Sequence, residues 1–314
     1  MSETPSGPVL SVVIVIVSDT TGTEADPTHL VGCLEGLEQQ VSPPAMEILV
    51  PYHARTTGIP ALRERFPHVR LVQVEDLKRF TGKGGNREHH DELRARGINL
   101  ARGAIVALLE DHGRPDPHWC RRMVQAHEED YVGVGGAIEN GIDRPLNWAV
   151  YYCDFGKYQN PIPRGASSFA SDANTSYKRS ALESIRPVWE ESFQETAVNK
   201  MFQDRGQRLA LSPDIIVFQE RRGLQLGAAV KERFVWGRSY AASRTQLVGG
   251  NRRVVYLALS PALPFLLFFR LAAVIYRKRR LSSRFLLAAP LVFCLLVSWS
   301  AGEFVGYVSA RPGL

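Results

Sequence analysis

Apolar and polar positions alternate in blocks along the first 140 residues of the chain. Short apolar runs of strand length separate longer stretches in which apolar residues recur every three or four positions. The short runs predict strands at 11–18, 47–50, 69–74, 104–109 and 132–138. The longer stretches predict helices at 30–37, 61–66 and 87–101. This alternation predicts an α/β fold with a mostly parallel sheet, in which ligands bind at the carboxyl ends of the strands.

The pattern changes character after residue 220. Before that point we expect helices at 180–184 and 195–205 and a last strand at 215–218. Beyond it two long apolar segments follow, 254–276 and 285–308, each close to the roughly 20 residues that cross a bilayer. We therefore expect three parts: a catalytic domain at 1–220, a basic amphipathic interface segment at 221–250, and two membrane-associated segments within 251–314.

The positive charge of the chain is concentrated around these apolar segments. The net charge is +6, but residues 220–284 hold 14 Lys and Arg against two acidic residues, a local charge of +12 that leaves −6 for the rest. A basic stretch beside apolar segments favours anionic membrane lipids as partners and argues against nucleic acid.

Two further features bear on the compartment. Cys33, Cys120, Cys153 and Cys294 lie far apart with no CxxC pair, which argues against a disulfide framework or a thiolate zinc site and fits a reducing compartment. The apolar run at 9–17 lacks the basic residues that precede the apolar part of a signal peptide. We therefore expect a protein of the cell membrane whose catalytic domain lies on the cytoplasmic face.

Residues of metal-binding types follow the strand at 104–109. Glu110, Asp111 and His112 stand together at its carboxyl end. Hard divalent cations take carboxylate oxygens and share their coordination with phosphate oxygens, and a neutral imidazole binds Mn²⁺. This motif predicts a cation that holds a diphosphate, and the alternative is a solvated strand end.

Four landmarks in this part of the chain resemble family 2 glycosyltransferases of the GT-A fold. They are the segment 101–106 before the metal motif, the glycines within 132–136, the segment 171–179, and Phe193-Gln194-Glu195 ahead of a helix that ends at Gly206. The resemblance covers about residues 11–244. It implies a GT-A catalytic domain that uses a nucleotide-diphosphate sugar and a divalent cation, Mn²⁺ or Mg²⁺.

The chain departs from the family pattern at two places. Glu110 and His112 stand where the family has Asp, so Asp111 is the aspartate that remains. At the end of the second strand, Pro51-Tyr52-His53 replaces the Asp that contacts the nucleobase in the family. Both departures concern residues that would bind the donor.

The resemblance makes Glu195 the candidate general base, since inverting transfer needs a carboxylate beside the acceptor hydroxyl. We expect the neighbouring Glu191 and Asp204 to be surface charges. Candidate metal ligands are Asp111, Glu110 and His112. Candidate donor-binding residues are Ser18, Asp19, Tyr52, Lys83, Arg94 and Arg238. Candidate acceptor-binding residues are Asp172, Asn174 and Trp148.

Several of these residues also fit a purely structural interpretation. Tyr52 either stacks on a base or packs in the core, and Trp148 either stacks on an acceptor sugar or packs among other aromatic residues. Arg238 either binds the diphosphate or meets lipid headgroups. Lys83 lies in a Gly-rich loop that is not a P-loop, and we expect this loop to lie over the nucleotide. The polar stretch 89–92 is expected to form a solvated helix face.

The apolar segments do not fit a simple pair of crossings. The segment 254–276 contains Arg270, and the link at 277–284 is strongly basic. Basic links tend to stay in the cytosol, whereas one crossing from a cytosolic domain would place this link outside. We therefore favour a re-entrant or interfacial hairpin, in which Gly302 and Gly306 pack helix against helix.

Taken together, the sequence predicts a membrane-attached, inverting glycosyltransferase that moves a sugar from a nucleotide-diphosphate donor to a lipid-linked or membrane-proximal glycan, such as a polysaccharide. The first alternative is a non-catalytic relative that binds sugar nucleotides or glycans, motivated by the altered metal motif. The second is a membrane-associated nucleotidyltransferase, which shares the sheet and the metal–phosphate chemistry. Release of nucleoside diphosphate rather than pyrophosphate separates the two enzymes.

Overall fold

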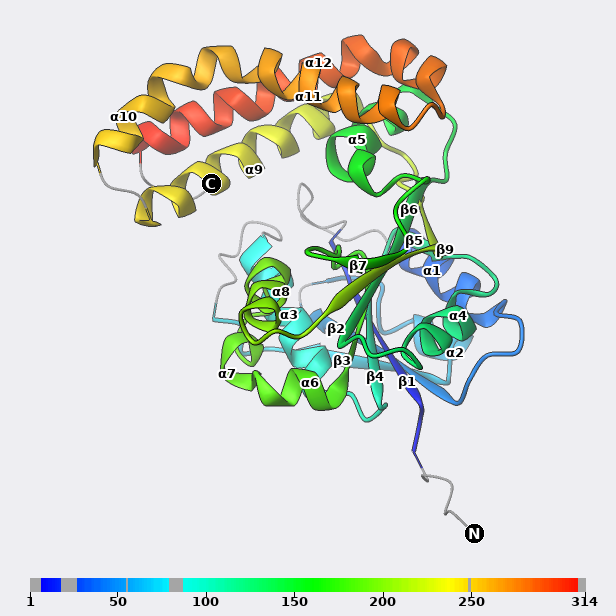
Figure 1. Ribbon diagram of the computed structural model, residues 1–314. Coiled ribbons are helices and arrows are strands. Elements are labelled where there is room, and N and C mark those ends of the chain that lie inside the picture. Colours follow the sequence, from blue (N-terminus) through cyan, green and yellow to red (C-terminus); the bar gives the residue numbers. More distant parts are fainter. Residues whose placement is uncertain (1–6, 18–26, 55, 79–86, 248–249, 310–314) are drawn as a thin grey trace. The chain divides into compact units, whose positions relative to one another are not determined.

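The computed structural model describes residues 7–17, 27–54, 56–78, 87–247 and 250–309 (Figure 1). The chain divides into two compact units. The first unit is Met1–Glu139 with Asn160–Glu220, and the second is Asn140–Gln159 with Arg221–Leu314. The segment 140–159 thus groups with the C-terminal helices, although it lies within the expected catalytic domain; the domain boundaries given above stay a prediction.

A mixed sheet forms the centre of the first unit. Its strands are β1 (Leu10–Val15), β2 (Met46–His53), β3 (Val69–Val74), β4 (Ile105–Glu110), β5 (Gly113–Pro115), β6 (Gly133–Asn140), β7 (Gly165–Ser167), β8 (Asn174–Lys178) and β9 (Leu209–Gln219). In the described residues their order is β3-β2-β1-β4-β8-β6-β9-β5, with β7 paired to β9. The pairs among β3, β2, β1 and β4 are parallel, and β8 adds antiparallel pairs to β4 and β6. The expected α/β fold is confirmed.

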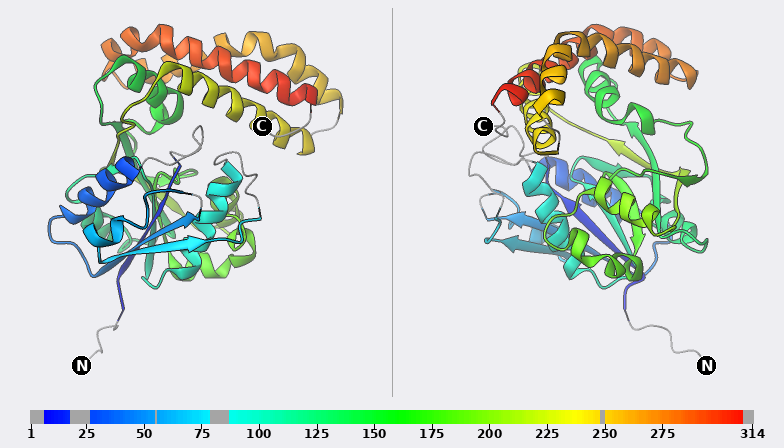
Figure 2. Two further views of the ribbon diagram at one scale, coloured as in Figure 1. Left: turned by 180° about the vertical axis from the view of Figure 1, so that it is seen from behind. Right: turned by 60° about the vertical axis from the view of Figure 1, so that its left-hand side comes forward.

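Helices cover both faces of this sheet (Figure 2). They are α1 (Pro27–Glu38), α2 (Leu62–Arg65), α3 (Arg87–Leu100), α4 (Trp119–Ala126), α6 (Arg179–Ser184), α7 (Arg186–Trp189) and α8 (Glu195–Asp204). Successive side chains of β1 enter different cores, because a strand directs alternate residues to opposite faces. Val12 and Ile14 join the cluster that includes α1 and α4, whereas Val13 and Val15 join the one that includes α3 and α8. A strand buried on both faces explains the continuous apolar run in the sequence.

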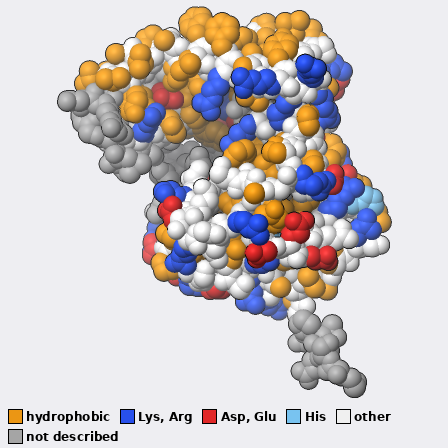
Figure 3. Space-filling view, in the orientation of Figure 1, with side chains coloured by type: hydrophobic (Ala, Val, Ile, Leu, Met, Phe, Trp, Pro, Cys, Tyr) orange, Lys and Arg blue, Asp and Glu red, His pale blue; other side chains and the backbone are white. Residues whose placement is uncertain are grey.

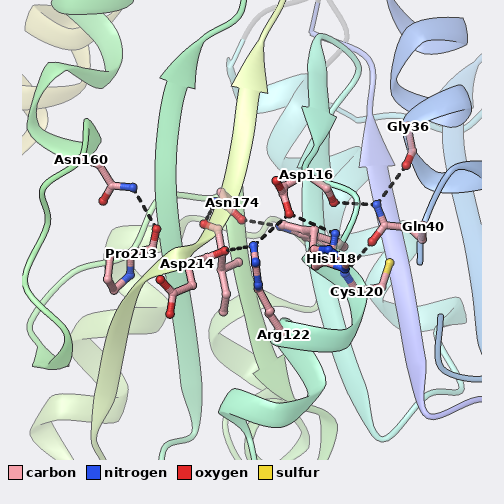
Figure 4. A network of polar contacts seen from close by, with 12 residues as sticks. Gly36, Gln40, Asp116, His118, Cys120, Arg122, Asn160, Asn174, Pro213 and Asp214 are labelled. Carbon is pink, nitrogen blue, oxygen red and sulfur yellow. Dashed lines mark hydrogen bonds and ion pairs between the residues drawn. The ribbon is translucent and has the colours of Figure 1, made fainter. Parts of the chain in front are cut away.

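Asn174 links several elements in the middle of the sheet. It is fully buried, and its Nδ2 donates to the carbonyl oxygens of Ala137 at 2.8 Å and Ile215 at 3.0 Å. Its Oδ1 accepts from Nε1 of Trp119 at 2.8 Å (Figure 4). The side chain therefore links β8 to β6, β9 and α4, and Asn174, a candidate acceptor-binding residue, begins a central strand.

The segment after β4 is anchored by a second set of polar contacts (Figure 4). Gln40 donates to the carbonyl oxygens of Gly36 at 3.0 Å and Asp116 at 2.8 Å, and it accepts from the backbone N–H of Cys120 at 2.8 Å. Arg122 bonds Oδ1 of Asp116 at 2.9 Å. These contacts hold the chain as it leaves the strand end that carries the expected metal motif.

The second unit is made of helices. They are α5 (Pro145–Phe155), the 3₁₀ turn η2 (Gly156–Tyr158), α9 (Leu226–Leu247), α10 (Gly250–Leu259), the 3₁₀ turn η3 (Ser260–Ala262), α11 (Leu263–Arg277) and α12 (Ser282–Ser309). Residues 253–277 and 282–309 are helical segments long and apolar enough to cross a membrane. Gly302 and Gly306 lie so close to α9 that an added Cβ would collide with the carbonyl oxygens of Phe234 and Arg238. The expected helix packing through these glycines is confirmed.

Candidate active site

Acidic residues from separate elements of the first unit converge on one buried arginine. Arg94 lies on α3, and its side chain is 4% exposed. Its Nη1 donates to Oδ1 of Asp91 at 3.0 Å, one helical turn earlier. Its Nη2 lies 3.3 Å from Oε1 of Glu110, the last residue of β4, and 3.0 Å from Oδ2 of Asp172, just before β8. Arg94 therefore ties the carboxyl end of β4 to the segment that leads into β8.

Glu195 joins the same cluster through the backbone. It is the first residue of α8, and its Oε2 accepts a hydrogen bond of 2.6 Å from the N–H of Asp172. The loop before α8 is held to α3, because the N–H of Phe193 donates to the carbonyl oxygen of Asp91 at 2.9 Å. The Glu195 side chain is half-buried, so part of it stays accessible. The structure thus brings together Glu110, Arg94, Asp172 and Glu195, which the sequence assigned to four different roles.

The cluster carries an excess of negative charge. Burial alone would lower the pKa of Arg94, but the carboxylates of Asp172, Asp91, Glu110 and Glu195 outweigh it and raise that pKa above its ordinary value. Arg94 is therefore permanently charged. One guanidinium against four ionised carboxylates leaves a formal charge of −3, which attracts cations to this edge of the sheet.

Asp111 and His112 lie next to this cluster at the end of β4. Asp111 is fully buried, and its Oδ1 accepts from the N–H of Val17 at 3.0 Å, just beyond β1. Nδ1 of His112 lies 3.6 Å from the same Oδ1, and the His112 carbonyl oxygen accepts from the N–H of Glu220 at 2.8 Å. Two residues of metal-binding types are therefore side by side. Within the described residues, no group of three His, Cys, Asp or Glu side chains is arranged to hold a metal ion.

Comparisons with known proteins give this geometry its context. A sequence profile described as Glycosyl transferase family 2 matches residues 29–186, just over half of the chain. The chain belongs to glycosyl transferase family 2. Among solved structures, the mannosyltransferase PcManGT from Pyrobaculum calidifontis, in complex with GDP-Man and Mn²⁺, has a similar fold, with a TM-score of 0.50 and 15% identity over 95% of this chain and 88% of that one. No curated protein matches the sequence.

Family membership confirms the resemblance found in the sequence and makes the chain a glycosyltransferase. The matched region holds Arg94, Asp172 and the motif at 110–112, whereas Glu195 and Arg238 lie beyond it. A structural likeness at 15% identity supports the GT-A type of fold. The roles of individual residues stay predictions.

The expectation of a solvated face at 89–92 is wrong. His89, His90, Asp91 and Glu92 are each at most 4% exposed. The ring of His89 packs between those of His53 and His90, and Glu92 accepts from the N–H of Lys78 at 3.0 Å. Polar residues at consecutive helical positions usually face water on at least one side, but residues 89–92 of α3 are covered on all sides.

Of the other predicted site residues, Tyr52 and Asn174 lie in the first unit, and Trp148 and Arg238 lie in the second. Tyr52 is 1% exposed in the core and donates to Oε1 of Gln73 at 3.2 Å. Asn174 is the sheet residue described above. Trp148 and Arg238 belong to the second unit, where Trp148 stacks on Tyr152. The core position of Tyr52 and the stacking of Trp148 agree with the packing role that the sequence left open for each of them.

Other predictions have simpler outcomes. Ser18, Asp19 and Lys83 lie outside the described residues. Glu191 and Asp204 are confirmed as surface charges, since their side chains are 72% and 55% exposed and pair with Lys78 and Lys200. Sequence reasoning missed Asp91, although its spacing of three residues from Arg94 on an expected helix was a usable signal.

Proposed function

We propose that this family 2 enzyme is an inverting transferase that moves a sugar from a nucleotide-diphosphate sugar to a lipid-linked or membrane-proximal glycan. The observation that carries the proposal is the placement of Glu195 within one network with Arg94, Asp172 and Glu110 at the carboxyl end of β4. Ligands of parallel α/β sheets bind at this edge. The relative PcManGT, complexed with GDP-Man and Mn²⁺, supports a nucleotide-sugar donor.

Glu195 is the base of the proposed mechanism. Its carboxylate accepts the proton of the acceptor hydroxyl as that oxygen attacks the anomeric carbon from the face opposite the nucleotide. The new glycosidic bond forms as the bond to the diphosphate breaks, and the diphosphate leaves with the electron pair. The hydrogen bond from the N–H of Asp172 fixes the orientation of the Glu195 carboxylate.

A divalent cation fits this site in part. Asp111 and His112 offer an oxygen and a nitrogen 3.6 Å apart, and the excess of carboxylates favours positive charge. Glu110, the third expected ligand, is instead paired with Arg94. Asp111 and His112 would therefore hold Mn²⁺ or Mg²⁺ together with diphosphate oxygens. Such an ion supplies charge stabilisation for the departing diphosphate.

Membrane attachment at the cytoplasmic face completes the proposal. It is supported by the apolar segments 253–277 and 282–309 and by the basic residues around them. The positive-inside tendency places such basic residues on the cytosolic side. An enzyme held there is positioned for a glycan acceptor attached to lipid.

The test is a binding screen on the full chain in mild detergent. Thermal unfolding is measured with GDP-mannose and with a panel of other sugar nucleotides, with and without Mn²⁺. We expect one donor to raise the unfolding temperature, as any ligand of the native state does, and to raise it further with Mn²⁺. Asp111→Asn should remove the Mn²⁺ increment, whereas Asp204→Asn, at an exposed ion pair, should keep it.

The product identifies the reaction. Nucleoside diphosphate released from the stabilising donor supports glycosyl transfer. Pyrophosphate released from a nucleoside triphosphate would contradict it in favour of a nucleotidyltransferase. Donor binding with no turnover of any acceptor or of water would favour the non-catalytic alternative.

A further inference from the structure

The long apolar helix α12 has two faces of different character. Residues that recur every three or four positions are buried against other helices of the second unit, among them Phe285, Val292 and Tyr307. The opposite side is exposed and carries Leu287, Val297, Phe304 and Val308. A helix that crosses a bilayer can have such a pattern, so what covers the buried face decides how the helix can sit in a membrane.

Helix α9 covers the C-terminal half of that face. The hydroxyl of Ser298 donates to the carbonyl oxygen of Val230 at 2.7 Å. A Cβ added to Gly237 would collide with the carbonyl oxygen of Trp299, as one added to Gly302 would with Phe234. Because the two backbones touch at successive turns, α9 and α12 form one closely packed pair, and separating them would lose this packing.

Charged residues occupy the part of α9 that lies against the middle of α12. The midpoint of Ser282–Ser309 falls between 295 and 296, so Ser298 is about 4 Å from it along the helix axis. Val230, its partner, is followed at once by Lys231, Glu232 and Arg233. If α12 crossed a bilayer, these three charges would lie close to the bilayer centre, where charged side chains are most costly.

Two of these three charges form ion pairs within the unit. Arg233 donates to Oδ1 of Asp154 at 2.6 Å, and Arg221 donates to Oε2 of Glu232 at 2.7 Å. The Asp154 carboxylate raises the pKa of Arg233 despite the opposing effect of burial, so Arg233 stays charged. The side of α12 that packs against α9 therefore faces a helix with charged residues.

Helix α5 gives the N-terminal half of α12 a similar neighbour. The ring of Tyr152 packs on Phe285 at 5.2 Å, and its hydroxyl donates to the carbonyl oxygen of Leu281 at 3.1 Å. Arg284, at the start of α12, pairs with Asp143 at 2.6 Å. Helices α5 and α9 thus pack along α12, and the ion pair between Asp154 of α5 and Arg233 of α9 joins them.

The outer side of α10, α11 and α12 is apolar. In the described part of the chain, 12 of the 17 exposed large hydrophobic residues lie on these three helices. Figure 3 shows the hydrophobic side chains gathered over them, with Lys and Arg nearby. Arg270 within α11 and Arg277, Arg280 and Arg284 at the link to α12 are also exposed. Apolar helices with exposed cations among them match a membrane with anionic headgroups.

We propose that α10, α11 and α12 form a monotopic membrane module, which lies in the plane of one leaflet with its outer face in the hydrocarbon and crosses the bilayer nowhere. This inference rests on the membrane attachment given under Proposed function and specifies its geometry. In this arrangement the basic link 277–284 stays on the side of the catalytic unit, so the positive-inside tendency is satisfied. The charged face of α9 remains at the headgroups.

Depth measurements along the exposed side of α12 test the module. A fluorophore is attached to the native Cys294, or to Leu287→Cys or Phe304→Cys in a Cys294→Ser chain, with Cys153 replaced by Ser throughout. Positions 287 and 304 are 17 residues apart, about 26 Å along the axis. The full chain is bound to vesicles of phosphatidylglycerol and phosphatidylcholine, and quenching by lipids spin-labelled at shallow or deep positions gives the depth of each site.

We expect the three sites to lie at the same shallow depth within a few ångströms. A crossing helix would instead place Cys294 deepest, with the other two sites more than 10 Å closer to opposite surfaces, and this profile would overturn the proposal. Chain that binds the vesicles without quenching at any site would also overturn it, since the apolar face would then meet protein. Failure to bind vesicles at all would refute the membrane attachment itself.

The two ends of α12 provide a second readout. Ser283→Cys and Ser309→Cys, each in a Cys294→Ser and Cys153→Ser chain, are treated from outside the vesicles with a membrane-impermeant maleimide. Both should react in full, because both ends lie on the side of the catalytic unit. Protection of one of them until detergent is added would show a crossing. Ser298→Cys, packed against Val230, is the control for a site shielded by protein.

Discussion

Replacing Arg94 with Met tests whether one buried cation holds the candidate site together. Arg94 lies within 3.3 Å of three carboxylates and is almost fully buried. Met keeps most of the side-chain volume but leaves Asp91, Glu110 and Asp172 without their counter-charge. Removing one partner of a buried ion pair costs about 3–5 kcal/mol. We therefore expect Arg94→Met to lower the free energy of unfolding of the first unit by about that amount.

The same helix offers a matched control. Arg96, two residues later, is 37% exposed and pairs with Asp76, which is 78% exposed. Exposed pairs of this kind contribute about 0–1 kcal/mol, so Arg96→Met should change little. The loss in Arg94→Met should also shrink between pH 7 and pH 5, since protonation neutralises the unpaired carboxylates.

Urea titrations of the full chain in detergent, followed by a short protease pulse that cleaves the unfolded first unit, give both free energies. If Arg94→Met loses no more stability than Arg96→Met, the carboxylates are not held by Arg94. The network on which the proposed site depends would then be refuted.

Two further predictions concern the first unit. His127 is buried with its Nε2 2.8 Å from the hydroxyl of Ser176, and burial, with Lys178 nearby, lowers its pKa to about 4. Because the unfolded chain binds this proton near pH 6.5, the free energy of unfolding should fall by about 3 kcal/mol as the pH drops from 6.5 to 4. Urea titrations of His127→Gln should therefore show a weaker pH dependence than those of the wild type. A Cβ on Gly97 would collide with Val13, so Gly97→Ala should push α3 away from β1 and lower the stability by about 1–3 kcal/mol. Calorimetry should also show weaker donor binding by this variant. Gly227→Ala, with open space around the new Cβ, should have neither effect.

The regular part of the fold was predictable because local pattern and burial agree there. Val12 to Val15 face helices on both sides of the sheet, so the strand shows as an apolar run. The strand-end motif at 110–112 was predictable for the same reason, since it follows another buried strand. Glu195 became a candidate through the family resemblance of its position before a helix, and in the structure that helix start lies beside Asp172.

What the sequence could not show depends on contacts between distant segments. Arg94 and Asp172 are 78 positions apart, and only the fold brings them within 3.0 Å. Asn174 has the residue type of a ligand-binding group, but its three hydrogen bonds go to β6, β9 and α4. The burial of His89 depends in part on packing against His53, 36 positions earlier in the chain.

The central claim is that Glu195 is the base of a glycosyl transfer. The most direct measurement is the rate of nucleoside diphosphate release, with the donor found in the screen and a glycolipid acceptor, for wild type, Glu195→Gln and Glu191→Gln. Glu191 lies four residues earlier and is 72% exposed, so it serves as the matched control. We expect Glu195→Gln to lose at least about 10²-fold in kcat with unchanged donor affinity, and Glu191→Gln to keep the wild-type rate. Near-normal turnover in Glu195→Gln would contradict the mechanism.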